Sequence, residues 1–247
     1  MSAPLEQHQT EIQLNRQSWD RKPLLREIYR GFYERIIAQI DRAAPGRVVE
    51  IGSGIGNLRE YFPQALATDL FPNPWLDLTC DGYELPFKEG ALSHLILFDV
   101  FHHLEAPVAF LNEAKRVLSP GGRVIVFDPY ISPASWPAYG VFHHEPVAWR
   151  KEIDFRGELP RPRAYYAAQG NATRLFFGDL SWLPGDWEIV GTQRFAAFAY
   201  LLSGGFSKPG LYPARLRGLM KMVDRTCSLL PGLFAGRCLV TLRRSGL

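Results

Sequence analysis

A carboxylate stands two residues before the first of three alternating glycines in the segment VVEIGSGIGN, residues 48–57. Glycine loses more backbone freedom on ordering than any other residue, so three of them indicate a loop that turns sharply or closely approaches a ligand. Glu50 would repel a phosphate held by Gly52, Gly54 and Gly56, whereas it would attract a cation such as an ammonium group. The spacing predicts a site for a small molecule that carries a positive charge.

A dinucleotide-binding loop is the alternative for a glycine pattern after a strand. Nicotinamide enzymes use G-x-G-x-x-G and place the pyrophosphate on the N-terminus of the following helix. In this chain the third glycine comes one residue early, and Asn57 stands where that glycine should be. An NAD-dependent dehydrogenase is therefore the less favoured alternative.

Side chains that could remove a proton follow two predicted strands, residues 92–100 and 123–129. They are His102, His103, Asp128 and Tyr130, with a later cluster of His143, His144 and Glu145. We predict His103 as the base, because it comes just past a strand end, with His143 and His144 as further catalytic candidates. The side chains of His143, His144 and Glu145 also suit zinc or iron, but adjacent histidines point apart in most backbones, so we expect no metal site.

Length and composition indicate one soluble domain over residues 1–247. Hydrophobic residues make up 47% of the chain and charged residues 21%, which is ample for a core. The three cysteines are far apart, which favours a reducing compartment, and the polar start lacks the apolar core of a signal peptide. We therefore expect a cytoplasmic protein.

Apolar spacing divides this domain into four segments. Residues 1–17 look loosely attached, and a helix is predicted within 18–44. Strands alternate with helices over the core, 45–130, which predicts a parallel sheet with helices on both faces. The Pro-, His- and aromatic-rich stretch 131–186 is predicted to be a lid or substrate insert. Residues 187–247 should form two antiparallel edge strands, 187–195 and 237–244, around a basic amphipathic helix.

Four segments of the core resemble class I S-adenosylmethionine-dependent methyltransferases, small-molecule branch, with a type 11-like domain. VVEIGSGIGN is similar to the family's E/D-x-G-x-G-x-G motif. ATDL, CDGYELPF and LILFDVFHHLEAPVAFLNEAKRVLSPGGRVIVFDP follow in the family's order, so the resemblance covers about residues 45–130. It implies S-adenosylmethionine as cofactor and a Rossmann-like α/β fold. That fold is a doubly wound, mostly parallel seven-stranded sheet with an antiparallel edge strand, an N-terminal helix and an inserted lid.

The same resemblance implies a set of cofactor-binding residues. Asp69 would accept hydrogen bonds from both ribose hydroxyls, and Asp81 would lie by the adenine amino group. A surface acid or helix cap is the alternative for both. The full predicted set is Glu50, Gly52, Ser53, Gly54, Gly56, Asn57, Asp69, Leu70, Asp81, Gly82, Phe98, Asp99 and His103.

Positive charge gathers at the end of the chain. Residues 194–247 hold nine Lys and Arg against one acid, a balance of +8, whereas the other 193 residues balance to −5. The predicted helix 213–230 has an apolar stripe beside a basic flank. The stripe is Leu216, Leu219, Met220, Val223, Cys227 and Leu230, and the flank is Arg217, Lys221 and Arg225. We expect peripheral contact with an anionic membrane through residues 211–230, the alternative being a helix packed on its own sheet.

These patterns predict a methyltransferase that acts on a small-molecule or lipid-linked acceptor. Oxygen, nitrogen and carbon acceptors all stay open. We expect no nucleic-acid partner, because the core is acidic on balance. A protein of a different class, which keeps the fold and cofactor site but only binds or docks, is the alternative.

Overall fold

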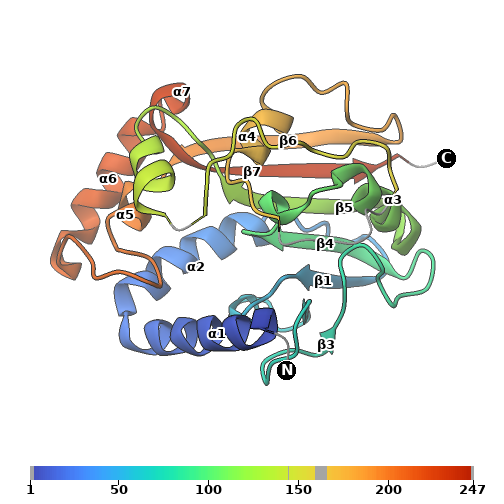
Figure 1. Ribbon diagram of the computed structural model, residues 1–247, viewed down its shortest axis with the longest axis horizontal. Coiled ribbons are helices and arrows are strands. Elements are labelled where there is room, and N and C mark those ends of the chain that lie inside the picture. Colours follow the sequence, from blue (N-terminus) through green and yellow to red (C-terminus); the bar gives the residue numbers. More distant parts are fainter. Residues whose placement is uncertain (1–2, 144, 159–165, 246–247) are drawn as a thin grey trace.

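A seven-stranded sheet forms the centre of the computed structural model, which describes residues 3–143, 145–158 and 166–245. Its strand order is β3-β2-β1-β4-β5-β7-β6 (Figure 1). The strands are β1 (Arg47–Ile51), β2 (Leu66–Asp69), β3 (Leu78–Thr79), β4 (Leu92–Phe98), β5 (Leu118–Pro129), β6 (Trp187–Ala196) and β7 (Ala235–Arg244). The predicted α/β fold with seven strands is confirmed.

The sheet is parallel from β3 to β5, and β7 is its antiparallel strand. β7 pairs with β5 on one side and with β6 on the other, antiparallel to both. The predicted pairing of segments 187–195 and 237–244 is therefore confirmed, although the antiparallel strand lies one place in from the edge. Strand order reverses beside β1, so the loop that follows β1 lies where open α/β sheets bind ligands.

Helices cover both faces of the sheet. Along β4, Leu95 and Leu97 face one core while Ile96 and Phe98 face the other, as the two-residue period of a strand requires. The first core includes α3 (Pro107–Val117) and α4 (Asn171–Phe176). The second includes α1 (Ala3–Arg21) and α2 (Pro23–Ile37), which lie at the lower left in Figure 1.

The N-terminal segment differs from its prediction, since most of it is a packed helix. In α1, Ile12 and Trp19 are buried, and the Trp19 ring nitrogen donates a hydrogen bond to Glu60 at 3.1 Å. The helix expected within 18–44 is two helices, because the proline at position 23 begins α2 at a place that needs no amide donor. The helix expected after the glycine loop is a 3₁₀ turn, η1 (Asn57–Glu60).

The predicted insert approaches the carboxyl ends of the parallel strands. It includes the π-helical segment η3 (Ala138–Phe142) and helix α4. The amide of Ala168 donates to the carbonyl of His102 at 3.0 Å, and the amide of Asp154 donates to Glu105 at 2.8 Å. Both acceptors follow β4, so this segment lies on the same edge of the sheet as the glycine loop.

The C-terminal helices differ from the prediction of one continuous apolar stripe. They are α5 (Phe198–Leu201), the turn η4 (Ala214–Leu216), α6 (Arg217–Cys227) and α7 (Pro231–Phe234). In α6, Met220, Val223 and Cys227 are half-buried, whereas Leu219 and the neighbouring Leu216 and Leu230 are exposed. The stripe therefore divides between two faces. Within the described ranges, no helix is both long and apolar enough to cross a membrane.

Candidate functional site

The glycine loop after β1 is a left-handed turn that only glycine adopts without strain. Gly52, Gly54 and Gly56 have φ of +66°, +54° and +70°. A Cβ on Gly52 would lie 2.4 Å from a methyl group of Val100, so the backbone there is also tightly packed. A Cβ on Gly54 would meet only Ile12 of α1, at 3.8 Å, so α1 lies against the outer side of the loop.

Asp69 ends β2 and fastens this loop to the neighbouring strand. Its Oδ2 accepts a hydrogen bond from the Gly54 amide at 2.9 Å, and its Oδ1 accepts one from the Leu70 amide at 2.7 Å. Ser53 adds to the connection, because its amide donates to the Thr68 carbonyl at 2.8 Å. A carboxylate oxygen can accept more than one hydrogen bond, so Asp69 keeps acceptor capacity beside the loop for the hydroxyls of a ligand.

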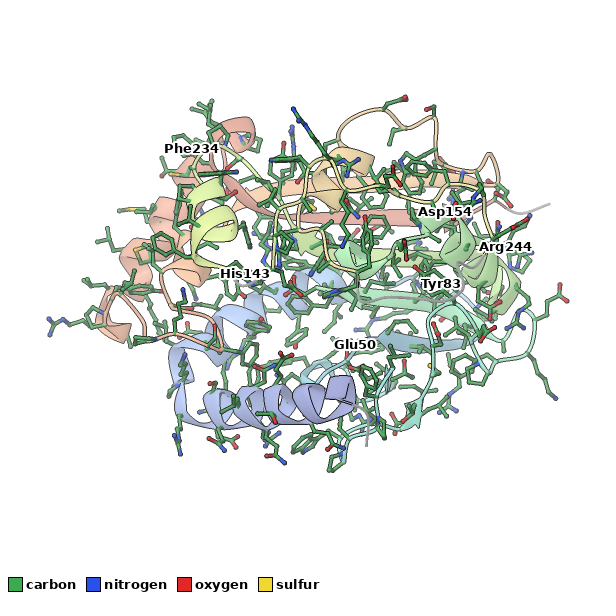
Figure 2. The ribbon with its side chains drawn as sticks, viewed as in Figure 1. Glu50, Tyr83, His143, Asp154, Phe234 and Arg244 are labelled. Carbon is green, nitrogen blue, oxygen red and sulfur yellow. The ribbon has the colours of Figure 1, made fainter. Side chains whose placement is uncertain are left out.

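Glu50 is a buried acid in the interior, above α1 in the view of Figure 2. Its burial raises the pKa of the carboxyl group to about 8, and the negative charge of Asp69 contributes. A bound cation would relieve this cost. The Oδ1 atom of Asn57 is also buried, and no described residue forms a hydrogen bond with it. A buried acid and an unpartnered amide oxygen fit the ammonium group and other donors of S-adenosylmethionine.

Three predicted cofactor residues have structural contacts of their own. Asp81 Oδ1 accepts a hydrogen bond from the Tyr83 amide at 3.0 Å, which orders the turn after β3. A Cβ on Gly82 would touch Ile51 at 3.4 Å. The Phe98 ring packs in the aromatic core, 4.8 Å between centroids from Phe127. The contacts of Asp81 and Phe98 account for these side chains without a ligand, and their cofactor roles stay predictions.

Asp99 follows β4 with φ of +57°, which is unusual for a residue other than glycine. Its carboxylate forms a two-pronged ion pair with Arg237 of β7. Arg237 is only 1% exposed, and its guanidinium lies 4.6 Å from the ring centre of Tyr200. No sequence pattern reveals this pair, because 138 residues separate its members and a charge count places the arginine in the basic C-terminal segment.

His102 is held between two carboxylates at the ends of β4 and β5. Its Nδ1 lies 3.0 Å from Asp128 Oδ1, and its Nε2 lies 3.3 Å from Glu145 Oε2. Burial lowers the pKa of this imidazole, but Asp128 and Glu145 outweigh it and raise the pKa to about 10. The predicted candidates Asp128 and Glu145 therefore meet around a histidine.

His103 shares this cluster in a different protonation state. Burial and the charge of His102 lower its pKa to about 4, so the ring is neutral. Its Nδ1 lies 3.0 Å from the Tyr166 carbonyl, which can only accept, so Nδ1 carries the hydrogen and Nε2 has a lone pair. That Nε2 lies 3.5 Å from Glu145 Oε1. The tautomer suits the predicted role of a base, which stays a prediction.

Of the two later predicted histidines, the structure describes only His143. His143 Nδ1 lies 3.9 Å from Glu145 Oε2 and 3.2 Å from Gln169 Nε2, so it borders the same cluster. Residue 144, the other predicted histidine, lies outside the described residues. Gln169 was not predicted. The fold brings its Nε2 within 2.6 Å of Glu145 Oε2, a contact between residues 24 positions apart that no sequence pattern indicates.

Comparison with known proteins gives a family match for the core. Residues 49–126 match the family described as methyltransferase domain. The demethylmenaquinone methyltransferase of Thermus thermophilus is 27% identical over 185 residues, covering 66% of this chain and 76% of that protein. An uncharacterized protein of Methanocaldococcus jannaschii is 29% identical over 103 residues, or 38% of this chain. The match spans only 50% of the length of that second relative.

A solved structure shares the fold over nearly the whole chain. An S-adenosylmethionine-dependent methyltransferase from Thermotoga maritima aligns with a TM-score of 0.50 and 14% identity. The alignment covers 92% of this chain and 95% of that one. At this identity the likeness shows a common fold, in agreement with the strand order described above.

Proposed function

We propose that this chain is a class I S-adenosylmethionine-dependent methyltransferase that transfers a methyl group to a small-molecule or lipid-linked acceptor. The observation that carries the proposal is the position of the histidine–carboxylate cluster, at the ends of β4 and β5 on the glycine-loop edge. The name of the Thermus thermophilus relative supports a small-molecule acceptor.

Each part of this edge has a separate task. S-adenosylmethionine supplies a methyl group on a positively charged sulfur. Glu50 would hold the ammonium group of the cofactor, and Asp69 would accept from its ribose hydroxyls. The positive-φ turn at Gly52, Gly54 and Gly56 would let the loop backbone approach the cofactor closely. The cluster of His102, His103 and Glu145 would face the acceptor and take part in removing its proton.

Asp69 provides the test of this assignment. Replacing Asp69 by Ala is expected to weaken S-adenosylmethionine binding by about 1.5–3 kcal/mol, the range for hydrogen bonds to a charged group. Isothermal titration measures the change, and Asp179→Ala, an exposed acid, serves as the matched control. Unchanged affinity in Asp69→Ala would remove this residue from the cofactor site.

Methyl transfer itself separates the proposed enzyme from a protein that only binds the cofactor. Incubating the chain with methyl-labelled S-adenosylmethionine and a bacterial small-molecule and lipid extract is expected to label one acceptor. Normal cofactor binding with no labelled product in any extract would favour the binding or docking alternative.

We also propose that the acceptor is reached at the surface of an anionic membrane on the cytoplasmic side. Exposed leucines, Leu229, Leu230 and Leu233, are 78%, 57% and 52% accessible around the end of α6 and in α7. Arg217 and Lys221 share a single acid, Glu27 of α2, which leaves a net positive charge beside them. The exposed Arg215 and Arg225 add to it.

The leucines are the side chains to change in testing membrane contact. The wild-type chain is expected to sediment with anionic vesicles and to be released by salt, because each basic residue near such a surface contributes about 1 kcal/mol. Replacing Leu229, Leu230 and Leu233 by Ser should abolish sedimentation, since burying one leucine contributes about 1.5–3 kcal/mol. Leu180→Ser, at an exposed leucine elsewhere, is the control. Equal sedimentation with neutral vesicles, or none with either, would contradict the proposal.

A further inference from the structure

Two adjacent histidines direct the same ring atom at one carboxylate. His102 and His103 lie in the turn η2 (Phe101–His103), where the backbone brings their ring centres within 4.2 Å. Nε2 of His102 lies 3.3 Å from one oxygen of Glu145, and Nε2 of His103 lies 3.5 Å from the other. The general tendency of adjacent histidine side chains to point apart does not hold at this turn.

In both histidines the other ring nitrogen, Nδ1, lies within hydrogen-bond distance of an acceptor oxygen. His102 Nδ1 lies 3.0 Å from a carboxylate oxygen of Asp128, and His103 Nδ1 lies 3.0 Å from the backbone carbonyl of Tyr166. Metal-binding histidines usually donate their second ring N–H to a carboxylate or a backbone carbonyl in this way. Both rings are thus oriented with Nε2 toward the same point.

The separations between these atoms suit two bonds to a common ion. Metal bonds from histidine nitrogen and carboxylate oxygen measure about 2.0–2.2 Å. Two such bonds at an angle of about 100–110° place the ligand atoms roughly 3.1–3.6 Å apart. A direct charge-assisted N–H···O hydrogen bond would be about 2.7–2.9 Å long. The measured 3.3 Å and 3.5 Å, which run to two different oxygens of Glu145, fall in the first range, so the carboxylate would bind the ion through both oxygens. One ligand atom from each of the three residues lies within 4.8 Å of the others.

Gln169 supplies an independent observation beside the same carboxylate. Its Nε2 donates to Glu145 Oε2 at 2.6 Å, which holds that oxygen in place. Gln169 is 2% exposed, yet its Oε1 atom is buried and has no hydrogen-bond partner among the residues that the structure describes. A buried oxygen of this kind is suited to accept from a water molecule bound to a nearby ion.

We propose that Nε2 of His102, Nε2 of His103 and the carboxylate of Glu145 bind one divalent transition-metal ion, with zinc as the reference ion. Two imidazoles and a carboxylate match the ligand preference of such ions, and three protein ligands leave a position open for water or a substrate. The ion replaces the proton on Nε2 of His102, and that proton leaves to solvent.

The ion changes the role of His103 within the proposed function. Its Nε2 would be a metal ligand and would no longer accept a proton. An acceptor hydroxyl in the open position would lose its own proton more readily, because a bound divalent ion lowers the pKa of oxygen ligands. Only this consequence rests on the proposed methyl transfer, since metal binding itself does not depend on it.

The test is a zinc titration of the tag-free chain of residues 1–247 after removal of metals with a chelator, without S-adenosylmethionine. Isothermal titration is expected to show one zinc ion per chain, and cobalt(II) should bind in its place with visible absorption. His103→Gln and Glu145→Gln should each weaken zinc binding by more than about 100-fold. Cys227→Ser, which removes a half-buried thiol outside the cluster, should leave zinc binding unchanged.

Circular dichroism melts without metal confirm that each variant is folded before it is titrated. Failure of the wild-type chain to bind zinc or cobalt would overturn the metal site, as would wild-type affinity in both ligand variants. A separate titration of the same metal-free chain with S-adenosylmethionine reports on the proposed function. The two proposals can therefore fail independently.

Discussion

Replacing Asp99 by Asn is expected to destabilise the protein by about 3 kcal/mol, because it leaves the buried guanidinium of Arg237 without its carboxylate. Burial would lower the pKa of Arg237, but the charge of Asp99 outweighs it and raises that pKa, so the arginine stays ionised. Urea unfolding of the cofactor-free protein measures the loss. The predicted value is at the low end of the range for broken buried ion pairs, since the Asp99 side chain is 31% exposed.

The double variant provides the control for this result. In Asp99→Asn/Arg237→Met the unpaired charge is gone, and a flexible apolar side chain lies among the rings of Tyr200, Phe127 and Phe32. The double variant should therefore be more stable than Asp99→Asn alone. If the two unfold at the same urea concentration, the loss does not come from an isolated buried charge.

Replacing Glu50 by Gln is expected to stabilise the cofactor-free protein and to weaken S-adenosylmethionine binding. The folded-state pKa of Glu50 is raised to about 8, above the value near 4.5 of an unfolded chain. The wild-type protein therefore loses stability as pH rises from about 4.5 to about 8, and the loss levels off above that range. One pKa unit corresponds to about 1.4 kcal/mol, which limits the stability gain of the glutamine variant to about 5 kcal/mol.

Thermal melts at pH 5 and pH 9 measure the stabilising effect. The Gln variant should melt above the wild type at pH 9 and close to it at pH 5, whereas the exposed Glu34→Gln should change neither. Cofactor affinity should fall by about 1.5–3 kcal/mol, because Gln cannot form a charged contact with the ammonium group. A variant that is less stable at pH 9, or that binds the cofactor normally, would contradict the assigned role of Glu50.

Local patterns predicted the part of the fold that we propose as the cofactor site. The apolar run before Glu50 became β1, and the glycine spacing became a turn with positive φ at Gly52, Gly54 and Gly56. The carboxylate of Asp69 lies against that turn, as its position at the end of the second strand indicated. These features depend on residues close in sequence or on adjacent parallel strands, so periodicity and spacing suffice to find them.

The remaining features depend on contacts between distant parts of the chain. Ile12 is buried beside the glycine loop, and Trp19 is buried beside Tyr29 of α2. No pattern within the N-terminal segment itself predicts these contacts. In the basic C-terminal segment, Arg237 is neutralised by Asp99. Charge counting along the sequence could not separate this internal arginine from those on the surface.

The histidine cluster was predicted only in part: its residues were indicated by the sequence, but their arrangement was not. The sequence indicated His102 and His103 as candidate bases, but it grouped Glu145 with His143 and His144 as candidate bases or metal ligands. The structure instead directs Glu145 toward η2, where its two oxygens meet two imidazoles. A short turn conformation and the path of the insert decide this arrangement, and neither has a periodic signature.

Titration of the wild-type chain with S-adenosylmethionine, and separately with NAD, tests the central claim most directly. The arrangement of Glu50, Asp69 and the glycine loop predicts that S-adenosylmethionine binds in a one-to-one ratio and that NAD gives no heat of binding. Binding of NAD together with no binding of S-adenosylmethionine or S-adenosylhomocysteine would contradict it.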